Sequence, residues 1–121
     1  MLEEKQINRN FKKLRNDLEE QEGITTISMA TLRDNVGAGK LGIHVRNGIS
    51  QRLAAEGISH YPEVLPEYQE NYVRLYQQGT LVENLINAVL QIGEEHDIFI
   101  RETISASDSR ILQRIRELVC D

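Results

Sequence analysis

The chain has 121 residues, with 14 Lys and Arg against 19 Asp and Glu, one cysteine and no tryptophan. This length suits one domain with an appended arm, and the net charge of −5 argues against a protein that coats nucleic acid or anionic membrane through bulk charge. One cysteine excludes an internal disulfide and a Cys-based zinc site, which favours a reduced, cytoplasmic setting. No apolar run approaches the roughly 20 residues that span a bilayer, so we expect no membrane contact.

The first predicted helix covers about residues 3–22, and Gly23 supplies its stop. Its apolar residues are spaced by four, three and four positions and form one narrow stripe, consisting of Ile7, Phe11, Leu14 and Leu18. Such a stripe either packs on the chain's own core or pairs with the same helix of a second chain. The four residues are therefore candidates for a homo-oligomer interface, in an arm and linker (residues 1–27) ahead of a helical domain (residues 28–121).

A short helix over about residues 29–36 follows, with Ser28 as its N-cap. The sequence Gly-Ala-Gly at 37–39 breaks it, and a longer helix is predicted over about residues 40–56, with aliphatic residues four positions apart at Leu41, Val45, Ile49 and Leu53. Gly48 lies inside this helix and costs roughly 1 kcal/mol relative to Ala. We expect that cost to be worthwhile only where another backbone or a ligand approaches closely.

Residues 58–66 form the predicted loop, and a helix is predicted to run from Pro66 to about Gln78. Its apolar face carries Tyr68, Tyr72, Leu75 and Tyr76. Tyrosines at this spacing are typical of a half-buried core, but tyrosines also anchor interfaces. Tyr68 and Tyr72 are therefore further candidate interface residues.

The C-terminal third is predicted to be helical as well. Thr80 and Glu83 form a capping box that opens one helix, Gly93 interrupts it, and a further helix reaches about Thr103, with a short strand at residues 98–100 as the alternative. A second capping box, Ser105 with Asp108, opens the last helix. The whole pattern predicts an all-α fold, a compact bundle of six or seven short helices with an N-terminal amphipathic helical arm.

The motifs favour binding over catalysis. His44, His60 and His96 are far apart and form no zinc signature, and the consecutive residues 94–97 point in different directions on a helix. The sequence Gly-Ala-Gly-Lys at 37–40 lacks the spacing of a phosphate-binding P-loop. We therefore predict no catalytic residue, no metal and no cofactor, and a protein that is not an enzyme.

Charged residues are distributed unevenly along the chain. Residues 29–65 carry four basic and three acidic side chains, whereas residues 66–121 carry five and ten. The backbone N–H groups at the start of the helix at 40–56 can bind one phosphate, although a tight interhelical turn that needs glycines for steric reasons is the favoured explanation. The candidate nucleic-acid contacts are the four basic residues of the first of these segments, Arg33, Lys40, Arg46 and Arg52.

Two stretches show the order of helix, turn and helix that is typical of a helix-turn-helix. Residues 29–56 read as a short helix, a glycine turn and a longer helix. Residues 72–90 resemble the first two helices of resolvase- and regulator-type helix-turn-helix domains. This second resemblance implies a DNA-reading helix after Gly93, yet that helix begins with Glu94, Glu95 and Asp97, which repel phosphates.

A further resemblance covers residues 31–62, about a quarter of the chain. The segment is similar to a small helical module of bacterial restriction- and defence-related proteins at Leu32, Gly37, Lys40, Gly42, Val45, Ile49, Leu53, Gly57 and Ile58. The resemblance implies a role associated with nucleic acid or with a protein partner.

Together these features predict a small non-enzymatic binding protein. We expect a helix-turn-helix-like, DNA-associated regulator or defence-system component that contacts DNA through residues 29–57 and forms a homo-oligomer through residues 3–22. The alternative is a protein-interaction or oligomerisation module that acts as an adaptor to a larger protein partner.

Overall fold

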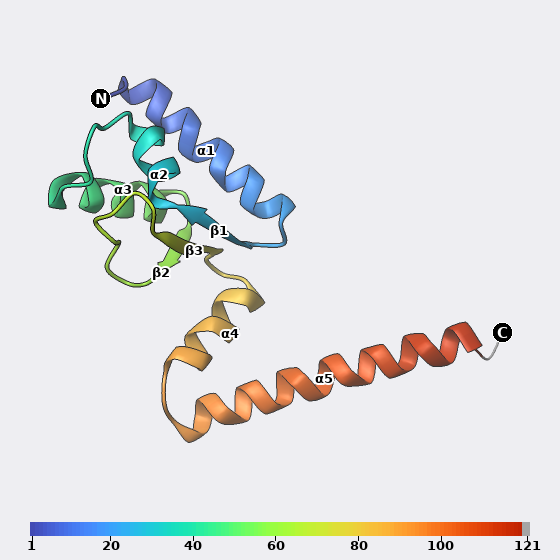
Figure 1. The fold of residues 1–121 in the computed structure, drawn as a ribbon. Helices are drawn as coiled ribbons and strands as arrows, with labels where there is room; N and C mark the ends of the chain where they lie inside the picture. The colour runs from blue at the N-terminus through green and yellow to red at the C-terminus, as the bar shows by residue number, and fades with distance from the viewer. Residues whose placement is uncertain (120–121) are drawn as a thin grey trace. The chain divides into compact units, whose positions relative to one another are not determined.

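The computed structural model describes residues 1–119, which contain five helices and one three-stranded antiparallel sheet (Figure 1). The predicted all-α fold with six or seven helices is therefore wrong, and the protein is mixed α and β. The chain divides into two compact units, Met1–Glu83 and Asn84 onward. The elements in chain order are α1 (Glu4–Glu20), β1 (Ile24–Ser28), α2 (Met29–Val36), α3 (Ile43–Ala55), β2 (Ile58–Tyr61), β3 (Tyr72–Gln77), α4 (Leu81–Leu90) and α5 (Glu94–Val119).

The sheet of the first unit has the strand order β1-β3-β2, with β3 in the centre. β1 pairs with β3 so that Ile24 lies opposite Tyr76, and β2 pairs with β3 so that Tyr61 lies opposite Arg74. Both pairings are antiparallel. The element order is thus helix, strand, helix, helix, and then a β2–β3 hairpin whose strands are joined by the loop 62–71.

β3 and the end of the loop 62–71 replace the helix predicted for residues 66–78. Val73 and Leu75 are buried, whereas Tyr72 before them and Arg74 between them are exposed, which is the alternation of a strand with one covered face. The apolar residues of this segment also fit a helical spacing. The helix prediction was wrong because β-branched and aromatic residues in a short segment favour a strand once two neighbouring strands pair with it.

The core of the first unit lies between helices α1, α2 and α3 and the sheet. Ile7, Phe11, Leu14 and Leu18 of α1 are buried there with residues of α2, α3 and β3, among them Met29, Leu32, Ile49, Leu53 and Leu75. α1 is therefore an integral layer of the first unit, and Figure 1 shows it alongside α2.

α2 and α3 are the short helix and the longer helix predicted for residues 29–56, and a turn that begins at Gly37 joins them. Ser28 caps α2, because its Oγ accepts a hydrogen bond from the N–H of Thr31 at 3.2 Å. Gly37 ends α2 in the left-handed conformation (φ 71°), and a Cβ at this position would lie 2.6 Å from the side chain of Leu2. Only glycine fits this turn without displacing the N-terminal segment.

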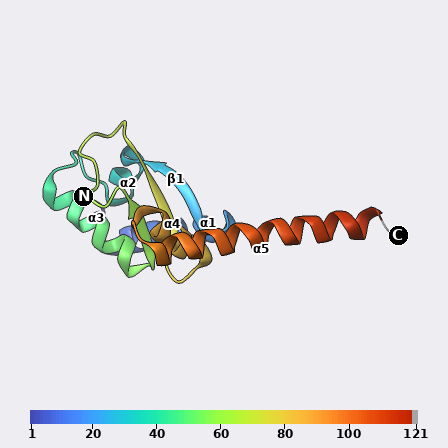
Figure 2. The same ribbon diagram turned by 90° about the horizontal axis from the view of Figure 1, so that it is seen from below.

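The capping box at Thr80 is confirmed, since the N–H of Glu83 donates to Thr80 Oγ1 at 3.3 Å at the start of α4. The predicted break at Ser105 is wrong. α5 continues through residues 105–108 without interruption, and the alternative strand at 98–100 is helical (Figure 2). Serine and aspartate cap helices readily but are also tolerated inside a long helix. The capping pattern alone therefore does not show that a new helix begins at Ser105. None of the helices within residues 1–119 is long and apolar enough to cross a bilayer.

Candidate nucleic-acid interface

The outer surface of α3 is the candidate site. Ile49 and Leu53 turn one side of the helix into the core. The opposite side exposes His44, Asn47 and Gln51, which are spaced by three and four residues and so share one face. None of these three side chains hydrogen-bonds to another residue within 1–119. We call these three residues the readout face, because their donors and acceptors are free to meet a ligand.

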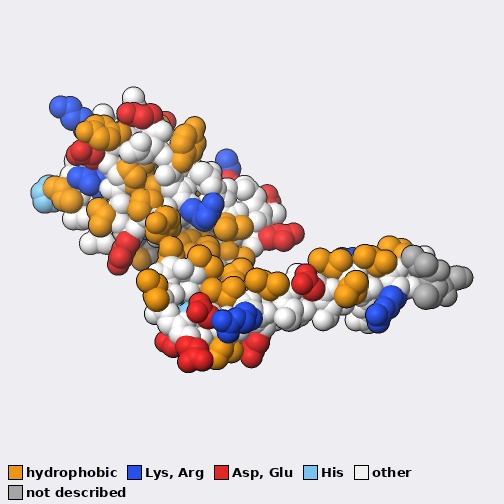
Figure 3. Space-filling view, turned by 60° about the horizontal axis from the view of Figure 1, so that its bottom comes forward, with side chains coloured by type: hydrophobic (Ala, Val, Ile, Leu, Met, Phe, Trp, Pro, Cys, Tyr) orange, Lys and Arg blue, Asp and Glu red, His pale blue; other side chains and the backbone are white. Residues whose placement is uncertain are grey.

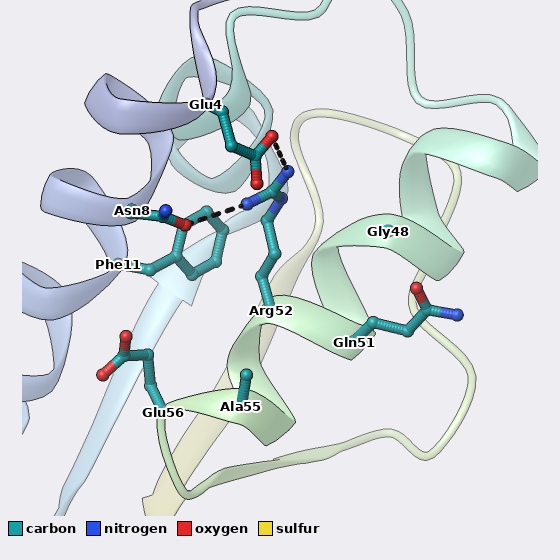
Figure 4. Close-up of a pocket in the computed structure, with 8 residues that line it drawn as sticks. All are labelled: Glu4, Asn8, Phe11, Gly48, Gln51, Arg52, Ala55 and Glu56. Atoms are coloured by element: carbon teal, nitrogen blue, oxygen red, sulfur yellow. Dashed lines mark hydrogen bonds and ion pairs between the residues drawn. The ribbon is translucent and has the colours of Figure 1, made fainter.

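On one side of the readout face, α3 and α1 enclose a groove of about 330 Å³ (Figure 4). Arg52 spans it, donating to Glu4 Oε2 at 2.9 Å and to Asn8 Oδ1 at 3.3 Å. Figure 4 shows Arg52 reaching towards α1, whereas Gln51 points away from α1. Arg52 thus joins two helices of the first unit.

The ion pair across this groove changes the ionisation of Glu4. The hydrogen bond from Arg52 and the attraction of its charge lower the pKa of Glu4, against a smaller opposing effect of desolvation. Glu4 therefore stays ionised and neutralises Arg52 at neutral pH. A phosphate at Arg52 would have to compete with this carboxylate.

Gly48 lines the same groove, and the space beside its Cα is open. A Cβ built on Gly48 would have no heavy-atom neighbour within 4 Å. Internal packing therefore does not require glycine here, and no other backbone of the described chain approaches it closely. The helix carries a destabilising residue beside an open surface.

The other flank of the readout face is tied to the hairpin loop 62–71. Arg46 donates to the carbonyl of Leu41 at 3.0 Å and to that of Leu65 at 3.2 Å. His60 Nδ1 lies 2.8 Å from the carbonyl of Pro62, which can only accept, so Nδ1 carries the proton. In the neutral ring, Nε2 then accepts from the hydroxyl of Ser50 at 2.6 Å.

The four predicted phosphate contacts are thus placed differently. Arg46 and Arg52 hold neighbouring segments, and Arg33 pairs with Asp34 at 3.3 Å and also donates to Gln69. Lys40 is exposed in the turn before α3 and forms no ion pair within residues 1–119. The structure therefore brings one free cation, Lys40, to the start of α3 and engages the three arginines in contacts within the unit.

A group of basic residues on α1 was missed by the sequence analysis. Residues 5–16 contain five basic and no acidic side chains, and four of them form no ion pair within residues 1–119, namely Lys5, Arg9, Lys12 and Lys13. Charge counted over the first 28 residues, five basic against six acidic, hides this group. A count along one helical face would have found it, because Lys5 and Lys12 share the face of Asn8, which lines the groove.

The hairpin loop has the opposite charge. Residues 62–71 contain Glu63, Glu67 and Glu70 and no basic residue. Tyr68 in this loop and Tyr72 on β3 are exposed. They do not share a helical face, because the predicted helix is absent, and a hydrogen bond to Glu67 raises the pKa of Tyr68.

The remaining predicted interface residues lie inside the first unit. Ile7, Phe11, Leu14 and Leu18 are at most 9% exposed and fill its core. In this conformation their side chains are not accessible to a second chain. Tyr76 is buried as well, and desolvation, with smaller effects of Glu83 and Glu63, raises its pKa.

No group of three or more His, Cys, Asp or Glu side chains within residues 1–119 is arranged to hold a metal ion. Comparison with known proteins adds no assignment, since no protein family, curated protein or solved structure matches the chain.

Proposed function

We propose that the first unit binds double-stranded DNA by placing α3 in the major groove. The observation that carries this proposal is the readout face, three side chains with hydrogen-bonding groups that no residue of the described chain engages. The elements α2 and α3, a short helix, a glycine turn and a longer helix, have the arrangement of a helix-turn-helix. In a helix-turn-helix the second helix reads base edges, and here that helix is α3.

The residue types of the readout face suit the major groove. The side-chain amide of one Asn or Gln makes two hydrogen bonds to one adenine, at N6 and N7. Each such two-bond contact is worth about 1–3 kcal/mol of discrimination against other bases. α3 has 13 residues and is about 20 Å long. Asn47 and Gln51 lie one turn apart on it, which places both amides on neighbouring base pairs when the helix lies in the groove.

Phosphate contacts come from the cations that have no carboxylate partner. Lys40 precedes α3, and Lys5 and Lys12 lie on the same face of α1 as Asn8, which lines the groove beside α3. The acidic loop 62–71 repels the DNA backbone and so supplies no such contact. Residues 1–83 carry ten basic and twelve acidic side chains, which supports a localised contact and opposes coating of DNA by charge alone.

A double alanine variant of the readout face tests the proposal. We expect Asn47→Ala/Gln51→Ala to weaken binding to a duplex selected from a random-sequence pool by at least about tenfold, because two amide contacts to bases are lost. Fluorescence anisotropy with the labelled duplex measures this change. Asn87→Ala/Gln91→Ala is the matched control, since it removes the same two exposed residue types at the same spacing near α4.

Two results would contradict DNA binding through α3. One is the absence of any selected duplex at low salt. The other is an equal loss of affinity in the two double variants. Circular dichroism of both variants checks that the helices are retained, which we expect because all four side chains are exposed.

The salt dependence of binding separates free cations from internally paired ones. We expect Lys12→Ala to reduce the slope of log K against log salt by about 1, because one phosphate contact and its counterion release are lost. Arg52→Ala should leave the slope unchanged, since Glu4 neutralises Arg52 in the free protein. Titrations at several salt concentrations measure both slopes, and a reduced slope in Arg52→Ala alone would assign the contact to Arg52.

The second candidate function, a protein-interaction module, is favoured by one specific observation, the large apolar side chains exposed along α5.

A further inference from the structure

α5 exposes more large aliphatic side chains than a solvated helix needs. Five of them in its C-terminal two thirds are between 51% and 83% exposed, namely Ile104, Ile111, Leu112, Ile115 and Leu118. Figure 3 shows hydrophobic side chains gathered along this helix. Contiguous apolar surface of this kind marks an interaction site in soluble proteins.

These side chains form one stripe. Ile104, Ile111, Ile115 and Leu118 are spaced by seven, four and three residues, which is the seam of a helix that pairs with another helix. Ile100, four residues before Ile104, continues the stripe and is partly exposed. The seam therefore extends over about five turns of α5, a length that suits a second helix better than a small apolar ligand.

The distribution of charge along α5 indicates which helix pairs with it. Residues 94–108 carry five acidic and one basic side chain, whereas residues 109–119 carry three basic and one acidic. α5 is thus complementary to itself in the antiparallel direction, in which the acidic half of each helix meets the basic half of the other. A twofold dimer needs a surface that matches itself in this way.

Asp108 favours the same direction. It lies in the seam, four residues after Ile104 and three before Ile111. Parallel helices in register would place Asp108 opposite Asp108 in an apolar seam, which is unfavourable for two carboxylates. Antiparallel helices that overlap over residues 94–119 place Asp108 opposite residue 105, a serine.

We propose that α5 is a dimerisation helix that pairs in antiparallel fashion with α5 of a second copy of this chain. This interface is distinct from residues 3–22, whose apolar stripe is buried. The inference goes beyond the proposed DNA binding and does not depend on it, although two helix-turn-helix units in one dimer would read two half-sites.

The mass of the full chain in solution tests the dimer. Light scattering after size exclusion should give twice the chain mass of 13.9 kDa, and Ile111→Glu/Ile115→Glu should give the single chain mass. Ser109→Glu/Gln113→Glu is the matched control, because it adds the same two charges on the opposite face of α5 and should remain a dimer. Circular dichroism of each variant verifies that the helix is retained.

Cysteine cross-linking tests the direction. In a Cys120→Ser background, Ser107→Cys lies near the middle of α5 and should cross-link in an antiparallel dimer, whereas Leu118→Cys near its end should not. Efficient cross-linking at Leu118 would overturn the antiparallel arrangement. A monomeric full chain, or a dimer unaffected by Ile111→Glu/Ile115→Glu, would overturn the dimer on α5 and assign the stripe to another partner. Asn47→Ala/Gln51→Ala should remain dimeric, so failure of DNA binding and failure of dimerisation are distinguishable.

Discussion

A chain that begins at Met29 is expected to lose the cooperative folding of the first unit. This truncation removes α1 and β1, and with them four core side chains and one of the two strands that pair with β3. Burial of an apolar side chain of this size is worth about 1.5–3 kcal/mol. Four of them amount to about 6–12 kcal/mol, which is comparable to the whole stability of a typical domain, about 5–15 kcal/mol.

Thermal unfolding followed by circular dichroism, with hydrogen exchange of β3, measures the effect of this truncation. A chain that ends at Leu90 is the control. It retains all the elements of the first unit and should keep its unfolding transition. If the chain from Met29 unfolds with the cooperativity and midpoint of the full chain, α1 is a dispensable arm and the core described above is incorrect.

Replacing Leu75 with alanine is expected to lower the free energy of unfolding by about 2–5 kcal/mol. Leu75 is fully buried in the central strand, so its loss leaves a cavity bounded by several elements. Urea unfolding at equilibrium measures the change, with an unaltered dependence on denaturant showing that the unfolded state is unaffected.

Leu81→Ala is the matched control for Leu75→Ala, because Leu81 is exposed at the start of α4. We expect it to change stability by no more than about 0.5 kcal/mol, as is usual for surface positions. Equal effects at the two positions would contradict the buried location of β3.

The helices of the first unit were predictable because each has a strong local signal. The stripe of α1, the serine cap of α2 and the aliphatic spacing of α3 all appear in the sequence, and the boundaries agree within three residues. The sheet was not predictable from the same signals. β1 and β2 have five and four residues, too few to show a period, and β3 has apolar residues that fit both a helix and a strand.

The candidate site was predictable only in its location. The glycine turn and the charge of residues 29–65 indicated α3. Which cations are free depended on tertiary contacts, such as that of Arg52 with Glu4 across 48 positions of the sequence. The readout face contains no Lys or Arg, so a search for these basic residues could not find Asn47 and Gln51.

The central position of β3 has a consequence for the order of folding. β2 and β3 are neighbours in the chain, with Tyr61 and Arg74 paired across 13 positions, whereas Ser28 of β1 pairs with Tyr72 across 44. Closing the longer loop costs more chain entropy and slows the pairing. The hairpin can therefore form early as a local nucleus, while β1 joins only after α2 and α3 have brought the two ends of this long segment together.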